Sequence, residues 1–404
     1  MEVKPGYKQT EVGVIPEDWE IQKLDVIAEI IMGQSPRGSS YNKKQQGLPL
    51  INGPTEFTNK TPIKIQWTTE PTKTCKKDDL LICVRGSSTG RMNISNDEYC
   101  IGRGVSAIRS NSNSNTKYIT YQLESAIRDL LSLTTGSTFP NLNSDTIRSL
   151  KIPVPRVKEQ TAIATALSDV DALISGLDRL IEKKRAIKQA AMQELLTGKR
   201  RLPGFSGEWT KKILSEIGTF IKGKGVKKDD VIPNGHPCIR YGELYTHHND
   251  SIKKIYSYIP DEIAKTSQKI KNGDILFAGS GETAEDIGKC ASYLFDNEAY
   301  AGGDVIIFSP KEQNSEFLGY LLNCPMVSRQ KARMGQGDAI VHISAKNLSQ
   351  IEISLPPLPE QTAIATVLSD MDAEISALET RKTKTISLKQ GMMQELLTGR
   401  IRLV

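Results

Sequence analysis

The stretch EQTAIATALSDVDALISGLDRLIEKKRAIKQAAMQELLTGKRRL (residues 159–202) occurs a second time, little changed, as EQTAIATVLSDMDAEISALETRKTKTISLKQGMMQELLTGRIRL (residues 360–403). At a constant offset of 201 residues and without a gap, the two stretches are identical at 27 of 44 positions. Fainter similarity extends outside them, as between DDLLICVRG from Asp78 and GDILFAGSG from Gly273. An internal repeat fixes architecture more firmly than local propensity does. The chain of 404 residues is therefore two tandem units, each a variable body followed by a nearly invariant tail.

Each tail has the pattern of a long helix. Pro155 and Pro359 lie where proline suits the first turn, and Gly198 and Gly399 lie where glycine takes the left-handed cap. A helix of about 38 residues, rising about 1.5 Å per residue, spans about 55 to 60 Å. Apolar residues at alternating steps of four and three predict the seam of a supercoiled helix. They are Ile163, Leu167, Val170, Ile174, Leu177 and Ile181 in the first tail, and Ile364, Leu368, Met371, Ile375 and Leu378 in the second.

The two helices are expected to pack on each other. A long helix must bury its apolar stripe against something, and both tails carry the same seam. Two tails kept alike must fit either the same kind of partner or each other. An antiparallel pair is favoured, with the bodies at opposite ends of a rod, because a parallel pair needs a connection running back along the whole rod.

The bodies are predicted to be α+β. Short β-branched apolar runs bounded by Gly, Asn, Ser and Pro indicate strands. The runs are LPLING, IKIQW, DLLICV, VSAIR and LKIPVP in the first body, and KKIYSYI, DILFA, DVIIF and IEISLP in the second. Helical patterns cover residues 117–133 and 316–332. The expected division is a first body at 1–155, a helical tail at 156–200, a second body at 201–355 and a second tail at 356–404.

Composition excludes several classes of protein. No apolar run of about 18 residues and no signal-like N-terminal segment occurs, so we expect a cytoplasmic protein with no membrane contact. The six cysteines form no C-x-x-C pair and are expected to be reduced structural thiols. A net charge of +6 suits a polyanion partner but decides little alone.

No catalytic motif stands out. Residues 279–284 (GSGETA) resemble a dinucleotide fingerprint, but a poor helix follows them, so a tight turn is favoured. No G-x-x-x-x-G-K-[ST] loop occurs, the four histidines form no metal motif, and no Asn-Pro-Pro-aromatic or Asp-Pro-Pro-aromatic tetrad of amino-methyltransferases is present. The sequence therefore predicts neither an active site nor a metal site.

Basic and polar loops recur at comparable places in both bodies. They are GQSPRGSSYNKKQQG, VRGSSTGRM and IGRG in the first, and KGKGVKKDD, RYGELYTHHN and MGQGDAIVH in the second. Arginine and lysine match guanine edges and phosphates, and Asn and Gln match adenine. This favours nucleic-acid binding. The basic residues Lys183, Lys184, Arg185 and Lys188 of the first tail are interpreted mainly as a solvated face, with a partner or DNA backbone contact as the alternative.

The whole chain resembles a specificity subunit of a type I restriction-modification system. The resemblance rests on two variable bodies, each followed by a helical region that begins E-Q-x-x-I, at Glu159 and Glu360, and ends M-Q-E-L-L-T-G, at Met192 and Met393. It implies a non-catalytic reader of double-stranded DNA, with the bodies as two pseudo-symmetric target-recognition domains and the antiparallel helices as a ruler. Each domain would read one half of an asymmetric bipartite site.

The resemblance also implies partners. Two adenine-N6 methyltransferase subunits carrying S-adenosylmethionine would dock on the helical regions, and two translocase and nuclease subunits using ATP with Mg would complete the restriction form. This chain would hold no cofactor and no metal. Recognition loops differ from member to member, so the candidate DNA contacts come from the loops themselves. They are Arg37, Lys43, Lys44, Arg85, Arg91, Arg103, Lys222, Lys224, Lys227, Lys228, Arg240 and Arg333.

Three alternatives remain at this point. The first is a two-armed protein-protein adaptor whose helices join other proteins. The second is a specificity subunit of a related phage-defence system. The third is an independent enzyme, which would act on DNA without a partner.

Overall fold

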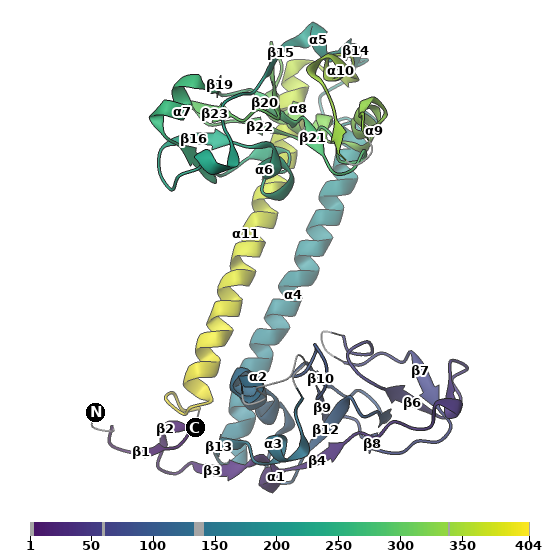
Figure 1. Cartoon of the computed structure of the whole chain (residues 1–404), viewed down its shortest axis with the longest axis vertical. Helices are drawn as coiled ribbons and strands as arrows, with labels where there is room; N and C mark the ends of the chain where they lie inside the picture. Colours follow the sequence, from purple (N-terminus) through teal and green to yellow (C-terminus); the bar gives the residue numbers. More distant parts are fainter. Residues whose placement is uncertain (1–3, 59–60, 133–140, 338–339, 404) are drawn as a thin grey trace. The chain divides into compact units, whose positions relative to one another are not determined.

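The computed structural model describes residues 4–58, 61–132, 141–337 and 340–403 (Figure 1). The chain forms two compact units, unit 1 from Met1–Asp178 with Thr380–Val404 and unit 2 from Arg179–Glu379. Each unit contains one body and a part of both long helices, α4 (Val157–Leu195) and α11 (Leu358–Leu396). The division at residues 155, 200 and 355 made from the sequence stays a prediction.

The first body is built on two sheets, in the order β10-β9-β12-β4 and β5-β7-β6-β11-β8. The first sheet is antiparallel, and the second contains the parallel pair β6–β11. The two remaining pairs are β1–β2 and β3–β13. The strands are β1 Tyr7–Thr10, β2 Gly13–Pro16, β3 Glu20–Lys23, β4 Ala28–Met32, β5 Tyr41–Asn42, β6 Leu48–Ile51, β7 Gln66–Thr68, β8 Thr74–Cys75, β9 Leu80–Cys83, β10 Met92–Ile94, β11 Tyr99–Ile101, β12 Val105–Ser110 and β13 Lys151–Val154; the helices are α1 Leu24–Ile27, η1 Gly38–Ser40, α2 Thr116–Ser132 and α3 Ser144–Arg148.

The second body repeats this plan with the sheets β15-β24-β20-β22-β17 and β18-β16-β23-β19. The parallel pair β16–β23 corresponds to β6–β11, and β14–β26 corresponds to β3–β13, while β17 adds a second parallel pair with β22. The strands are β14 Thr210–Ile213, β15 Gly218–Lys222, β16 His236–Ile239, β17 Ser251–Ile252, β18 Ser257–Ile259, β19 Gln268–Ile270, β20 Ile275–Ala278, β21 Ser280–Gly281, β22 Cys290–Tyr293, β23 Ala299–Ala301, β24 Val305–Pro310, β25 Val341–His342 and β26 Glu352–Leu355; the helices are α5 Leu214–Ile217, η2 Lys228–Asp230, α6 Tyr241–Thr246, α7 Asp261–Thr266, α8 Ser315–Leu322, α9 Pro325–Met334 and α10 Ala345–Ser349.

The long helices run antiparallel within each unit. In unit 1, Asp171 and Asp178 pair with Lys389 and Lys382, so one number rises as the other falls. In unit 2, Lys184 and Lys188 pair with Glu374 and Asp372 in the same sense. The predicted antiparallel pairing is therefore confirmed. Gly198 and Gly399 have φ of +68° and +72°, as expected for left-handed caps after each helix.

The predicted seam is buried at most of its positions. Ile163, Leu167, Ile364 and Leu368 are at most 1% exposed because each pair packs into an apolar cluster of its own unit. Leu177, Ile181 and Ile375 are also buried. The remaining seam residues are half-buried: Val170, Ile174, Met371 and Leu378.

The α+β prediction is confirmed, with one correction. Each predicted apolar run overlaps a strand, and α2 covers the described part of residues 117–133. Residues 316–332 are two helices rather than one, because Pro325 removes a backbone donor and begins a new helix, α9. Ser280–Gly281 forms a short strand inside GSGETA, and the turn follows at residues 284–288. The expectation that no regular helix follows this motif is confirmed, whereas the predicted tight turn lies at its end.

Candidate functional site

The first helix begins with a buried glutamate that is held from the far end of the chain. Glu159 is 2% exposed and accepts hydrogen bonds from the Arg402 guanidinium, at 2.8 Å between Nη2 and Oε2. Trp19 Nε1 donates to the same oxygen at 3.1 Å, and the guanidinium lies 5.6 Å from the Trp19 ring. Arg402 also pairs with Asp18. The hydrogen bonds to Glu159 and Asp18 raise the pKa of Arg402. The hydrogen bond from Arg402 lowers the pKa of Asp18.

The second helix repeats this arrangement. Glu360 is fully buried and accepts from Nε and Nη2 on one edge of the Arg201 guanidinium, which lies 5.8 Å from the Trp209 ring. The hydrogen bond to Glu360 raises the pKa of Arg201. Trp209 Nε1 differs from its counterpart, since it has no hydrogen-bond partner among the described residues. Each E-Q-x-x-I element thus receives an arginine from the segment that follows the other helix.

The glutamine of each element ties its helix to the adjoining body. Gln160 accepts from the backbone N–H of Asn115 at 2.9 Å and donates to the carbonyl of Pro155 at 2.8 Å. Gln361 makes the same two contacts, at 3.0 Å to Asn314 and 2.9 Å to Pro356. Both elements therefore have a structural role within this chain.

A repeated Lys-Asp-Tyr cluster connects the two helices and the body in each unit. Lys389 Nζ lies 2.9 Å from Asp171 and 5.1 Å from the ring centroid of Tyr121, whose hydroxyl donates to Asp171 at 2.7 Å. In unit 2, Lys188, Asp372 and Tyr320 match these contacts at 2.7, 5.0 and 2.7 Å. Burial, and the hydrogen bond to the aspartate, raise the pKa of both tyrosines.

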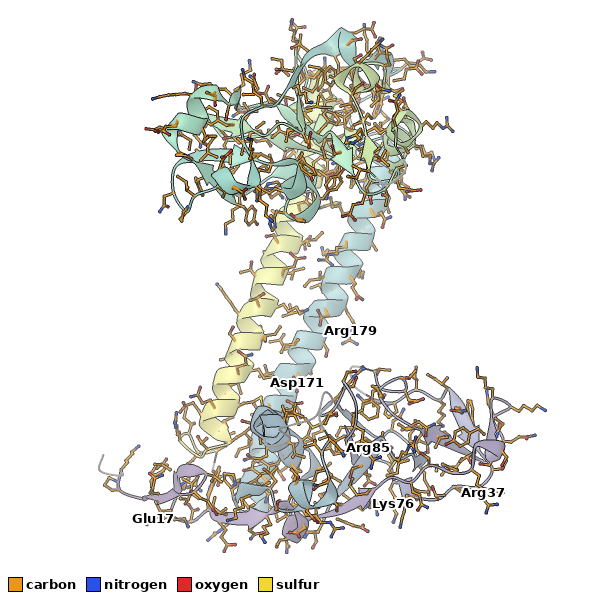
Figure 2. All side chains as sticks on the ribbon, viewed as in Figure 1. Glu17, Arg37, Lys76, Arg85, Asp171 and Arg179 are labelled. Carbon is orange, nitrogen blue, oxygen red and sulfur yellow. The ribbon has the colours of Figure 1, made fainter. Side chains whose placement is uncertain are left out.

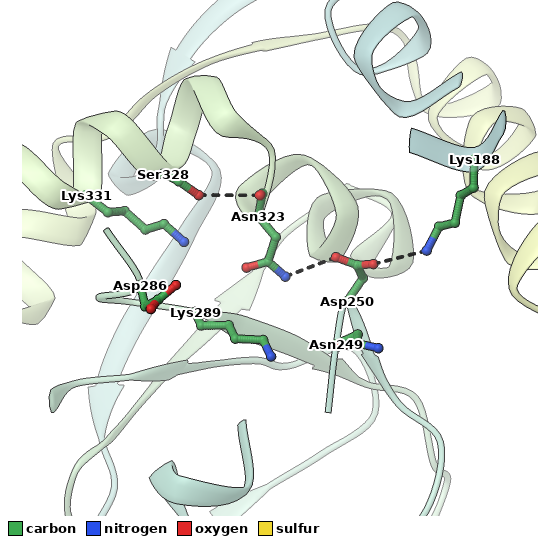
Figure 3. A pocket seen from close by; sticks show the side chains of 8 residues that line it. All are labelled: Lys188, Asn249, Asp250, Asp286, Lys289, Asn323, Ser328 and Lys331. Carbon is green, nitrogen blue, oxygen red and sulfur yellow. Dashed lines mark hydrogen bonds and ion pairs between the residues drawn. The ribbon is translucent and has the colours of Figure 1, made fainter. Parts of the chain in front are cut away.

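Lys188 also reaches a polar pocket in unit 2 (Figure 3). Its Nζ lies 3.4 Å from Asp250, and Asn323 donates to the other Asp250 oxygen at 3.1 Å. Burial raises the pKa of Asp250, while Lys188 and Asn323 act in the opposite direction. Lys331 lines the same pocket, is 1% exposed and donates to the Gly288 carbonyl at 2.7 Å. Burial lowers the pKa of Lys331. The pocket's charged groups thus join helix α4 to the second body.

The interpretation of residues 183–188 as a solvated face is wrong for Lys188, whose side chain is 14% exposed, whereas Arg185 pairs with helix α11 but stays exposed. Lys184, Arg185 and Lys188 form ion pairs with Glu374, Glu379 and Asp372 of helix α11. The reason is the antiparallel register, which sets acidic residues of α11 opposite this basic segment. Lys183 is exposed.

The candidate DNA contacts of the first body are all exposed but do not form one cluster. Arg37 precedes η1, and Figure 2 shows it well apart from Arg85, which follows β9. Lys43 and Lys44 lie in the loop between β5 and β6. Two others contact neighbouring loops. Arg91 donates to the carbonyl of Phe57 at 2.9 Å, and the backbone N–H of Arg103 donates to Ser35 Oγ at 3.1 Å.

The candidates of the second body are brought closer together. Lys227, Lys228 and Arg240 line one cavity of about 550 Å³, whose wall also includes the glycines at 302 and 303. Lys222 lines a neighbouring cavity, Lys224 is exposed nearby in sequence, and Arg333 lies at the end of α9. No contact with DNA is present to test any of the twelve candidates, so they stay predictions.

The sequence reasoning missed the charged residues at the helix ends and in the clusters. A usable signal was present, because Arg201 and Arg402, and likewise Lys188 and Lys389, are identical at the offset of 201. Tyr121 and Tyr320 gave a weaker signal, since they lie in the diverged bodies. Residues that are identical in the two tails bond to the other tail within each unit, so the tails fit each other.

Neither a membrane-spanning helix nor a metal-ligand cluster occurs in the described part of the chain. No helix there is long and apolar enough to span a lipid bilayer. No group of three or more His, Cys, Asp or Glu side chains in these residues is placed to hold a metal ion. All six cysteines are buried free thiols.

The repeated plan agrees with a comparison against known families. The model described as type I restriction modification DNA specificity domain matches residues 16–185 and again residues 206–388. The chain belongs to this family. It carries two copies of the DNA specificity domain, and the resemblance noted from the E-Q-x-x-I and M-Q-E-L-L-T-G elements is confirmed.

Relatives cover the chain to different extents. It is 26% identical over 407 residues to the type I restriction enzyme MjaVIII specificity subunit of Methanocaldococcus jannaschii, covering 96% of this chain and 94% of the relative. It is 38% identical over 200 residues to a protein of the same organism described as an MjaX specificity subunit. That match spans about half of each protein, 49% of this chain and 47% of the relative.

Solved structures share the fold. The S subunit of a type I restriction-modification system from M. genitalium aligns over 98% of both chains with a TM-score of 0.61 and 16% identity. A chain from a study of type I complex assembly aligns over 96% of this chain and 99% of its own length, with a TM-score of 0.57 and 17% identity. At such identities these matches show the common architecture alone.

Proposed function

We propose that this chain is the DNA-reading subunit of a type I restriction-modification complex and recognises an asymmetric bipartite target. Each body would read one half-site. The observation that supports this is the combination of like frameworks with unlike loops. The two bodies share a strand plan and helix anchors, while the exposed basic residues of their loops differ.

The helices supply the second part of the proposal. Two like tails offer two equivalent docking places by pseudo-twofold symmetry, each for one adenine-N6 methyltransferase subunit with S-adenosylmethionine. Two translocase and nuclease subunits, with ATP and Mg, would complete the restriction form. The chemistry and all cofactors would reside on these partners, and this chain would contribute recognition.

The helix pair would also set the gap between the half-sites. Two half-sites read from one side of a duplex lie about one helical turn, 10 to 10.5 base pairs, apart. Equal lengthening of both helices is then expected to lengthen the spacer of the recognised sequence without changing its half-sites.

Methylome sequencing of cells with and without the gene tests the proposal. We expect one split, adenine-containing motif to lose its methylation in the deletion strain. A gel-shift assay at moderate salt, with the purified methyltransferase partner, should give a sequence-specific complex on that motif. An unchanged methylome together with no specific complex would favour the adaptor. Methyl transfer or cleavage by the purified chain alone would favour an independent enzyme.

A further inference from the structure

We infer that Arg240 reads a guanine edge in the half-site bound by the second body. This inference rests on the proposed function and adds to it the identity of one specificity-determining residue. It concerns a base contact, as distinct from the phosphate contacts that any exposed lysine can make.

The Arg240 side chain is held in place by a buried carboxylate. Its Nε and Nη2 both lie 3.1 Å from Glu243 Oε1. Glu243 is 3% exposed, and it is fixed in turn by Ser257 Oγ and by the backbone N–H of Arg240 at 3.3 Å. A long side chain that is already ordered loses little conformational freedom on binding.

This arrangement uses one edge of the guanidinium and leaves another. Nε and one N–H of Nη2 face Glu243, whereas Nη1 makes no hydrogen bond to a described residue. The Nη1 and Nη2 end of the fork therefore keeps a parallel pair of donors. Two parallel donors match O6 and N7 of guanine in the major groove. About a third of the Arg240 side chain, 32%, is exposed.

The surroundings suit a nucleic-acid strand. Arg240 lines the cavity with Lys227 and Lys228, which can contact phosphates. Gly302 and Gly303 form part of the wall and carry no side chain that would block a base edge. Glu243 and Asp304 also line the cavity, but the three basic groups leave one excess positive charge.

Comparison with the first body favours base reading over phosphate binding. Gly102 N–H donates to the Ile51 carbonyl at 2.8 Å, and Gly302 N–H donates to the Ile239 carbonyl at 3.1 Å. Asn52, which follows Ile51, thus occupies the place that Arg240 takes after Ile239. A shared phosphate contact would need a cation in both bodies. The amide of Asn52 suits adenine and the guanidinium of Arg240 suits guanine. The residue at this position therefore differs between the bodies in the way expected of a residue that contacts a base.

The test uses the full chain assembled with its methyltransferase subunit and duplexes in which each base pair of the methylome-defined target is changed in turn. For the wild type, one guanine in one half-site should contribute about 5- to 150-fold in affinity. Arg240→Lys keeps the charge but lacks the fork. It should lose the discrimination at that guanine alone and keep the salt dependence of binding. Glu243→Gln should weaken the same discrimination.

Two further variants complete the design. Lys227→Gln is expected to weaken binding to all duplexes equally and to reduce the salt slope by about one, as for a phosphate contact. The exposed Lys265, in α7, does not line the cavity and provides the control Lys265→Gln. If Arg240→Lys retains every base preference, or Arg240→Gln behaves like Lys227→Gln, the inference is wrong although the proposed function stands. If the wild-type complex shows no sequence preference, both are wrong.

Discussion

At the scale of single residues, the two buried glutamates are the most sensitive points of the fold. Glu159 and Glu360 are removed from water, so each depends on its arginine and on neighbouring donors. A buried charge that loses its partner costs far more than the net contribution of the pair itself.

We predict that Arg402→Gln destabilises the protein by about 3 to 5 kcal/mol, because Glu159 and Asp18 both lose their counter-charge. Urea unfolding of the full chain measures this. Arg400→Gln is the matched control, since Arg400 is 56% exposed and pairs with Glu395 at 3.5 Å. It should cost less than about 1 kcal/mol. Equal losses for the two variants would show that the buried glutamate does not need Arg402.

A buried histidine gives a pH-dependent prediction. His248 is 2% exposed, and its Nε2 has no hydrogen-bond partner among the described residues. Burial lowers its pKa below 6.5, although the nearby Glu243 acts in the opposite direction. The folded protein therefore binds fewer protons than the unfolded chain as the pH falls below about 6.5. The stability contributed by neutral His248 is present above that pH and is lost on acidification.

His248→Gln should accordingly flatten the fall in unfolding free energy between pH 6.5 and 5. The slope removed is at most about 1.4 kcal/mol per pH unit for one proton. Unfolding of the wild type and the variant at half-unit pH steps tests this. Parallel curves for the two proteins would contradict the prediction.

At the scale of elements, the helix pair combines an apolar seam with ion pairs of unequal burial. The Lys188 and Asp372 side chains are 14% and 22% exposed, whereas those of Lys184 and Glu374 are 32% and 49% exposed. Solvent screens the second pair more strongly. The two pairs should therefore contribute differently although both join the same helices.

A double-mutant cycle measures this difference. We predict a coupling energy of about 1 to 3 kcal/mol for Lys188 with Asp372 and of at most about 1 kcal/mol for Lys184 with Glu374. Methionine at the lysine positions and Asn or Gln at the acidic positions preserve side-chain length. The ranking would be refuted by equal coupling energies from urea unfolding.

The helix ends give a matched pair of glycine substitutions. Gly198 and Gly399 are both left-handed, so alanine at either position costs about 1 to 2 kcal/mol. A Cβ on Gly399 would also lie 2.5 Å from Pro16 Cδ, whereas the nearest atom to one on Gly198 is 3.4 Å away, in Trp209. Gly399→Ala should therefore lower the melting temperature more than Gly198→Ala. The reverse order would rule out the Pro16 contact as the cause.

The elements were largely predictable from the sequence, and their contacts were not. The helices were predicted from the repeat, the 4-3 spacing and the cap glycines. These signals are visible in a short stretch of sequence or in an alignment of the chain with itself. Pro325 could have indicated the break between α8 and α9, but the apolar pattern on both sides favoured one continuous helix. The partners of Lys184, Arg185 and Lys188 depend on the antiparallel register, which a single helix does not encode.

The candidate site was less predictable still. Exposure of Arg37, Lys43 and Lys44 follows from their polar loops. The buried Glu243 behind Arg240 could not be foreseen, because a glutamate in the first turn of a short helix such as α6 is ordinarily solvated. Nor did the sequence indicate that Lys227 and Lys228 share a cavity with Arg240. Both segments bond to the end of β23, through Lys224 with Ala301 and Ile239 with Gly302, and such long-range backbone contacts cannot be seen in the sequence.

At the scale of the whole molecule, each unit is internally assembled by the same set of contacts. Arg402 with Glu159 and Lys389 with Asp171 hold unit 1, and Arg201 with Glu360 and Lys188 with Asp372 hold unit 2. Duplicated contacts explain why the tails stayed alike while the bodies diverged. A loop can change without disturbing these contacts, but a helix end must still fit the end of its duplicate.

The contact between Gly399 and the β1–β2 hairpin bears on the order of the two halves along the polypeptide. Tyr7 donates to the Gly399 carbonyl at 3.0 Å, so the two segments touch as Gly198 touches Trp209 inside the chain. A peptide linker between residues 403 and 4, with new ends opened at the exposed Pro203–Gly204 turn, should keep the Arg402–Glu159 and Arg201–Glu360 pairs. The rearranged polypeptide is expected to show an unaltered circular dichroism spectrum. The same fold would then form whichever half is translated first, and the present order would reflect only how the duplication arose.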